Sequence, residues 1–200
     1  MAQRSYRWLF IVLALVGVSV DLASKYVVFR TLYNGQREGT RDLVPGVFQF
    51  HVDFRHGAEE CDCYLTKLNG PIPPRVNHGA LFGLGNEHTR SANFFFLVVS
   101  VLAALAIVVW GTRTSTRQDL LLSAALGLIL GGTLGNLFDR IVFGGVRDFM
   151  YFYAIEWPVF NIADCCLVVG AGLLLFHAMF VHQELPSPLP ANSLDPVTVE

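Results

Sequence analysis

The sequence predicts an all-α membrane protein with four transmembrane helices and a small extracytoplasmic β-sheet and loop region. Of its 200 residues, 53% are apolar and only 15% are charged, a composition typical of integral membrane proteins. Four apolar runs are each about 18 to 23 residues long, enough to cross about 30 Å of hydrocarbon in helical conformation. We expect the spans at about residues 8–28, 93–110, 120–137 and 159–181.

Residues 1–184 are expected to form one domain that contains all four spans. Residues 185–200 are rich in proline and lack an apolar period, which predicts a disordered cytoplasmic tail. The alternative interpretation of the first run is a cleaved signal peptide, but Asp21 and Lys25 interrupt the place where a cleavage site would lie. We therefore expect a retained first helix.

Basic residues determine the expected orientation. Arg4 and Arg7 precede the first span, and Arg113 and Arg117 lie in the short linker between the second and third spans. By the positive-inside rule, both segments and both termini face the cytoplasm. The long loop, residues 29–92, and the opposite ends of the spans then face outward.

The long outer loop combines a strand pattern with an inserted segment. Residues 47–52 alternate in a way that predicts a strand on the membrane surface, and residues 76–83 are expected to form a second strand and a turn. The stretch at about 55–75 is rich in glycine and proline and has no apolar period. We expect it to be an accessory surface loop.

Ionisable side chains at membrane depth are costly and by default indicate a functional site. Asp21 and Lys25 are four residues apart on one face of the first span; an internal ion pair or a role in orienting another polar group would each explain them. At the end of the third span, Asn136, Asp139 and Arg140 form a polar face. The simplest alternative there is an interfacial ion pair with a snorkelling arginine.

Three glycines in the third span, Gly127, Gly131 and Gly135, recur every four residues. Such a ridge allows another helix backbone to approach closely, so we interpret it as a helix-packing surface.

Two acids lie at the boundaries between loops and spans. Asn161 is a favoured N-cap and Asp164, three residues later, would complete a capping box, so neither residue by itself requires chemistry. Asp148 alone is a loop acid beside Arg147. If the ends of the third and fourth spans lie together, however, Asp148 and Asp164 become neighbours, and two carboxylates in a dry cleft are the working parts of an aspartic protease.

Cysteine and histidine residues raise the alternative of a metal site. Cys165 and Cys166 fall inside an apolar run and are expected to be small buried hydrophobic residues. In the outer segment, a C-x-C pair with scattered histidines lacks firm zinc-ligand spacing, so we expect no metal. The candidate ligands there are His51, His56, Cys61, Cys63, His78 and His88.

The chain resembles lipoprotein signal peptidase (signal peptidase II), a family of four-span aspartic peptidases of bacterial inner membranes. The resemblance covers most of the chain, from Asp21 to about Phe176, and rests on linked motifs in order. They are D-x-x-x-K from Asp21, N-x-G-A-x-F from Asn77, G-N-x-x-D-R-x-x-x-G-x-V-x-D-F from Gly135 and F-N-x-A-D from Phe160. Two departures, an insertion of about twenty residues before Asn77 and the residues His78 and Leu81 in the second motif, bear on substrate entry rather than on the acids.

This resemblance implies that Asp148 and Asp164 are the catalytic pair. It implies a membrane aspartic endopeptidase that cuts a diacylglyceryl-modified prolipoprotein just before its lipidated cysteine, at the outer face of the bacterial cytoplasmic membrane, without metal or cofactor. The residues that match positions lining or bracing the site are Asp21, Lys25, Asn77, Gly132, Asn136, Asp139, Arg140 and Asn161.

The implied partners are the prolipoprotein substrate and membrane lipid, and the enzyme is expected to be a monomer. The chain has a net charge of −2 and no long basic run, so we expect no nucleic-acid partner. The rival function is a non-catalytic membrane scaffold or transport subunit. It would explain the glycine ridge but would leave Asp148 and Asp164 without a shared role.

Overall fold

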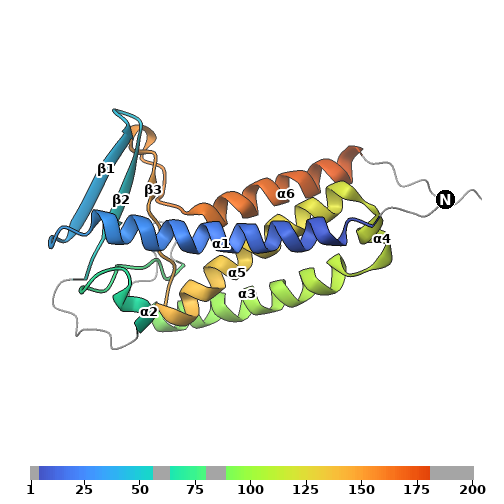
Figure 1. Cartoon of the computed structure of the whole chain (residues 1–200), viewed down its shortest axis with the longest axis horizontal. Coiled ribbons are helices and arrows are strands. Elements are labelled where there is room, and N and C mark those ends of the chain that lie inside the picture. Colours follow the sequence, from blue (N-terminus) through green and yellow to red (C-terminus); the bar gives the residue numbers. More distant parts are fainter. Residues whose placement is uncertain (1–4, 56–63, 80–88, 181–200) are drawn as a thin grey trace, which may run out of the picture.

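Four long helices lie side by side, with a small sheet at one end of the bundle (Figure 1). The computed structural model describes residues 5–55, 64–79 and 89–180. In this part of the chain, four helices are long and apolar enough to cross a membrane, and the expected four-span architecture is confirmed. They are α1 (Arg7–Leu32), α3 (Thr89–Gly111), α5 (Leu120–Val142) and α6 (Ile162–Phe180). The expected tail at 185–200 lies outside the described residues.

Helix α5 packs against each of the other three spans, and its glycines allow the close approach of α1 and α6. A Cβ atom at Gly131 would lie 2.9 Å from the carbonyl oxygen of Ala14 in α1, and one at Gly135 would lie 2.5 Å from Oδ2 of Asp21. Gly132 faces the other way, against the backbone of Ala163 in α6. The predicted small-residue ridge is therefore a packing surface for α1, and Gly132, outside that ridge, lets α6 approach α5.

A three-stranded antiparallel sheet lies at the C-terminal end of α1 (Figure 1). Strand β2 corresponds to the strand expected at 47–52. Its partners differ from expectation. Strand β1 was not predicted because its residues show no apolar alternation and all but one are exposed, and Asn77 forms only an isolated bridge with Val146. Residues 80–83 of the expected second strand lie outside the described part. The strands are β1 (Glu38–Val44), β2 (Phe48–Asp53) and β3 (Met150–Tyr151).

An apolar cluster joins the sheet to the bundle. Phe29 at the end of α1 and Val52 in β2 are fully buried, and Phe149, just before β3, is 1% exposed. Because Phe149 follows Asp148 directly, this cluster anchors the backbone beside that acid. The described residues contain two further short elements after α3: α4 (Thr114–Gln118), between α3 and α5, and the 3-10 turn η3 (Tyr153–Ile155), after β3.

The inserted segment is not simply a surface loop. Residues 64–75 contain the short helix α2 (Tyr64–Lys67), in which Thr66 is 5% exposed, and Asn69 just beyond it is fully buried. Pro74 forms an isolated bridge with Phe54. The expectation of a surface loop does not hold for the buried residues Thr66, Asn69 and Pro74, and Ile72 packs against the apolar cluster beneath the sheet. The accessory role of the segment stays a prediction. Residues 56–63 are outside the described part.

Candidate active site

Asp148 and Asp164 lie together at the sheet end of the bundle and are joined by one residue. Asp148 is in the loop that leaves α5, and Asp164 is in the first turn of α6. The backbone N–H of Asn161 donates to Oδ2 of Asp164 at 3.1 Å, and its side-chain amide donates to Oδ1 of Asp148 at 2.6 Å. The proximity expected from the sequence is therefore present.

Each carboxylate accepts a further hydrogen bond from a neutral amide. Nδ2 of Asn77 donates to Oδ2 of Asp148 at 3.0 Å, and Nδ2 of Asn136 donates to Oδ1 of Asp164 at 2.9 Å. Among the described residues, neither acid forms an ion pair. Both are half-buried, so the pair is only partly screened by solvent.

The environment of Asp148 favours its protonated form. Burial raises its pKa to about 7, and the negative charge of Asp164 acts in the same direction, while the hydrogen bonds from Asn77 and Asn161 oppose both effects. Two adjacent carboxylates that cannot both ionise cheaply share a proton. Near neutral pH, Asp148 is therefore populated in both its protonated and its ionised form.

The first turn of α6 is capped by the same residues that form the site. The backbone N–H of Asp164 donates to Oδ1 of Asn161 at 3.1 Å, which with the reverse bond forms the expected capping box. Asp21 reaches across from α1, where its Oδ1 accepts from the N–H of Ala163 at 2.9 Å. Capping and a chemical role for Asp164 are therefore compatible, because the cap holds its carboxylate toward Asp148.

Lys25 orients the amide that contacts Asp164. Its Nζ lies 2.7 Å from Oδ2 of Asp21, 3.3 Å from Oδ2 of Asp139 and 3.2 Å from Oδ1 of Asn136. Because this amide oxygen faces the ammonium group, the amide nitrogen of Asn136 faces Asp164. Lys25, Asp21 and Asp139 are fully buried, so the ion pair expected on α1 also orients a group at the site.

Comparison with known proteins places this arrangement in a family. Residues 72–180, more than half of the chain, match the model of the family described as signal peptidase (SPase) II. The chain belongs to the signal peptidase II family. The matched range includes both acids and their three asparagine partners, whereas Asp21 and Lys25 precede it.

Relatives of this signal peptidase II chain match it over most of its length. The lipoprotein signal peptidase of Symbiobacterium thermophilum is 34% identical over 178 residues, which cover 88% of this chain and 97% of the relative. That of Nitratidesulfovibrio vulgaris is 40% identical over 160 residues, covering 78% and 87%. A solved structure described as a bacterial membrane enzyme matches with a TM-score of 0.66 at 22% identity, covering 94% of this chain and 99% of the other. This structural match supports the fold.

In this signal peptidase II chain, Asp139 is paired differently from the sequence expectation. It does not pair with Arg140; its Oδ1 lies 2.7 Å from NH2 of Arg147. Consecutive helical residues point about 100° apart, so Asp139 faces α1 and the loop while Arg140 faces α3. There, Arg140 donates to Oδ1 of Asn93 at 3.4 Å and lies 5.0 Å from the ring centre of Phe96.

Arg147 is the principal residue that sequence reasoning missed. Its side chain is fully buried, between the rings of Tyr26 at 4.3 Å and Phe143 at 4.0 Å. Its Nε also donates to Asp139 at 3.2 Å, and its backbone N–H donates there at 2.9 Å. The sequence held one indication of this role: if Lys25 pairs with Asp21, a buried Asp139 needs a second cation as its partner.

The histidines of the proposed metal alternative have other partners. His51 lies 3.2 Å from Asp53, and Nδ1 of His78 lies 2.8 Å from the carbonyl oxygen of Gly144. In the described ranges, no three His, Cys, Asp or Glu residues are grouped as metal ligands. The remaining candidates, His56, Cys61, Cys63 and His88, lie outside those ranges, as does Leu81.

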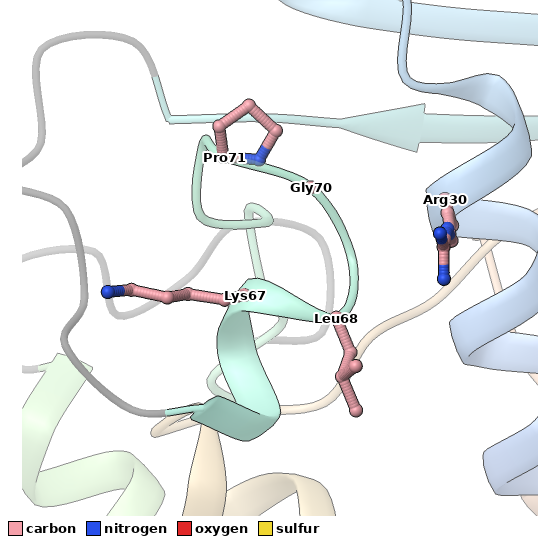
Figure 2. Close-up of a pocket in the computed structure, with 5 residues that line it drawn as sticks. All are labelled: Arg30, Lys67, Leu68, Gly70 and Pro71. Carbon is pink, nitrogen blue, oxygen red and sulfur yellow. The ribbon is translucent and has the colours of Figure 1, made fainter.

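A pocket of about 490 Å³ lies between the end of α1 and the inserted segment (Figure 2). It is not the candidate active site, because neither acid lines it. Its two cations do not converge: Figure 2 shows the Lys67 side chain extending away from Arg30. The lining residues are Arg30, Lys67, Leu68, Gly70 and Pro71.

Proposed function

We propose that this protein is a membrane aspartic endopeptidase that removes the signal peptide from diacylglyceryl-modified prolipoproteins, cutting just before the lipidated cysteine, with Asp148 and Asp164 as the catalytic pair. The family supports the substrate class. The observation that carries the residue assignment is that Asn161 donates to both carboxylates at 2.6 Å and 3.1 Å. Neutral amides hold the pair, which leaves both acids able to exchange protons.

Hydrolysis follows from one proton shared between these two acids. The ionised carboxylate takes a proton from a water held between them, and the water oxygen attacks the scissile carbonyl carbon. The protonated carboxyl donates a hydrogen bond to the carbonyl oxygen and stabilises the charge that develops there. Proton transfer to the amide nitrogen then lets the C–N bond break, and the amine leaves with the lipidated fragment. These steps require only two carboxyl groups and one water.

The remaining site residues hold this pair in place. Lys25 and Asp21 orient the amide of Asn136 and cap α6, and Gly132 allows α5 and α6 to approach. For Arg140, which binds α3, we retain a supporting role at the rim of the site. The full supporting set is Asp21, Lys25, Asn77, Gly132, Asn136, Asp139, Arg140 and Asn161.

We place the active site at the outer side of the bacterial cytoplasmic membrane. The sheet and the start of α6, whose first turn contains Asp164, lie toward one end of the bundle (Figure 1). Helix α4, which contains Arg117 and follows Arg113, lies at the other end. The positive-inside rule assigns that second end to the cytoplasm. A lipid-anchored substrate then reaches the monomeric enzyme by lateral diffusion, with membrane lipid as its other contact and no nucleic-acid partner.

The test uses the purified full chain and a synthetic lipidated prolipoprotein, with release of the signal peptide followed by mass spectrometry. Wild-type protein should cut before the modified cysteine, and Asp148→Asn and Asp164→Asn should each abolish turnover in folded protein. Because a catalytic pair acts as one unit, the double variant should lose little more than either single one. Activity should survive a chelator, which separates this mechanism from a metal site. Substantial turnover by Asp148→Asn would refute the assignment, and no cleavage by the wild type would favour the scaffold or transport alternative.

A further inference from the structure

The backbone that carries Asp148 is attached to α5 through Arg147. The guanidinium and the backbone N–H of Arg147 both bind Asp139, at 2.7 Å and 2.9 Å. Two aromatic rings enclose the guanidinium. Since Asp148 is the next residue, a shift of Arg147 would move the catalytic carboxylate with it.

The inserted segment provides the remaining partner of this arginine. Oδ1 of Asn69 accepts from NH1 of Arg147 at 2.7 Å, and Asn69 is fully buried. Its own amide nitrogen donates to the carbonyl oxygen of Thr66 at 3.1 Å, which fixes the orientation of the amide. Asn69 precedes residues 72–180, the range matched by the family model.

From Asn69, contacts continue to the site without interruption. Arg147 binds Asp139, Asp139 lies 3.3 Å from Nζ of Lys25, and Lys25 binds the oxygen of Asn136. Asn136 donates to Asp164. One side of this network thus fixes the backbone before Asp148, and the other orients the amide bound to Asp164.

The geometry points to Arg147 and Asn69 as positioning residues for cleavage: Asn69 holds the guanidinium of Arg147, and Arg147 sets the place of Asp148. Both side chains are fully buried, so neither contacts substrate. Their loss should therefore lower kcat and leave KM unchanged. The inference rests on the proposed function, but it is tested by variants that retain both catalytic acids.

The inserted segment also offers an exposed position, Lys67, for a matched control variant. Figure 2 shows its side chain extending away from the chain that continues toward Gly70. Lys67→Gln keeps most of the side-chain length and lies two residues from Asn69. It should retain wild-type kcat and KM.

The experiment measures kcat and KM per folded, monodisperse enzyme with the lipidated prolipoprotein. Asn69→Ala and Asn69→Leu remove the acceptor of a buried guanidinium, and kcat should fall about tenfold with KM within twofold of wild type. Asn69→Asp restores an acceptor oxygen, and the backbone N–H of residue 69 still serves Thr66, so kcat should return to within threefold. Arg147→Lys keeps the charge but loses the two-pronged contact with Asp139 and should lower kcat about tenfold.

The outcomes separate the two proposals. An inactive wild type contradicts the proposed function, whereas an active wild type with unchanged kcat in Asn69→Ala and Arg147→Lys overturns this inference alone. A loss confined to KM, or no recovery in Asn69→Asp, also overturns it. If Asn69→Ala and Asn69→Leu give no folded protein, Arg147→Lys decides: a selective fall in kcat supports the inference, and wild-type kcat overturns it.

Discussion

Replacing Asp148 by Asn should make the protein more stable at pH 8. Below the unfolded-state pKa of about 3.8, Asp148 is protonated in both folded and unfolded protein, and its titration contributes nothing to the pH dependence. Between about pH 4 and pH 7 the folded protein retains the proton while the unfolded chain has lost it. Wild-type stability therefore falls as pH rises through this window, and the loss is complete above the folded-state pKa of about 7. Asn does not titrate, so the variant escapes this loss.

The magnitude follows from the size of the pKa shift. A rise from 3.8 to about 7 corresponds to about 4 kcal/mol at about 1.4 kcal/mol per pKa unit. Because Asp148 is half-buried, screening by solvent lowers this to about 2–4 kcal/mol. The Asn side chain can accept from Asn77 or from Asn161 but not from both, which costs about 1 kcal/mol at every pH. The informative quantity is thus the change with pH in the stability difference between Asp148→Asn and the wild type.

The assay is thermal unfolding in detergent, at one scan rate because membrane proteins often unfold irreversibly. The Tm of Asp148→Asn minus that of the wild type should increase by about 5 °C or more between pH 4 and pH 8 and then level off. A control with the opposite sign is Asp53→Asn, since His51, 3.2 Å away, lowers the pKa of Asp53. That variant should lose stability near pH 6 and match the wild type at low pH. A Tm difference for Asp148→Asn that stays constant or falls as pH rises would refute the reasoning.

Three further predictions concern the supporting structure. Asp139→Asn removes the carboxylate that two buried cations, Arg147 and Lys25, share. It should lower the free energy of unfolding by about 3–5 kcal/mol, more than the loss of a pair with Arg140 alone would predict. Folded protein with the wild-type Tm would contradict this. Gly131→Ala places a Cβ 2.9 Å from the Ala14 carbonyl and should cost about 1–3 kcal/mol, whereas a Cβ at exposed Gly172 meets nothing within 4 Å, so Gly172→Ala should leave Tm unchanged or slightly higher. In a cysteine-free background, an impermeant thiol reagent added outside intact cells should label a cysteine at Thr40, which is exposed on β1, and miss one at Ser115, which is exposed on α4; the reverse pattern would invert the topology.

Features that depend on local sequence were predictable. Span length and apolar composition set the four helices, and the spacing from Asn161 to Asp164 gave the capping box because both partners lie within one turn. The glycine ridge of α5 indicated close packing, since a period of four residues places its members on one face. In each case the physical cause lies within a single helix.

Features that depend on tertiary pairing were not predictable in the same way. Asp139 has Arg140 as its sequence neighbour, yet helical geometry turns them apart and a loop returns Arg147 to Asp139. Asn69 lies in a segment rich in glycine and proline whose attachment is a hydrogen bond to a residue 78 positions away. An apolar period cannot reveal this hydrogen bond, because both of its partners are polar side chains.

The distribution of charge explains why amides surround the two acids that we propose as the catalytic pair. Asp21 and Asp139 are matched by Lys25 and Arg147, all fully buried, so this network is neutral as a set. The remaining acids, Asp148 and Asp164, receive hydrogen bonds only from neutral groups among the described residues: Asn77, Asn136 and Asn161. A cation in direct contact would hold its acid ionised and remove the proton that one member must donate. The amides orient the carboxylates without that cost, and Lys25 and Arg147, which are paired with Asp21 and Asp139, fix the frame that holds the amides.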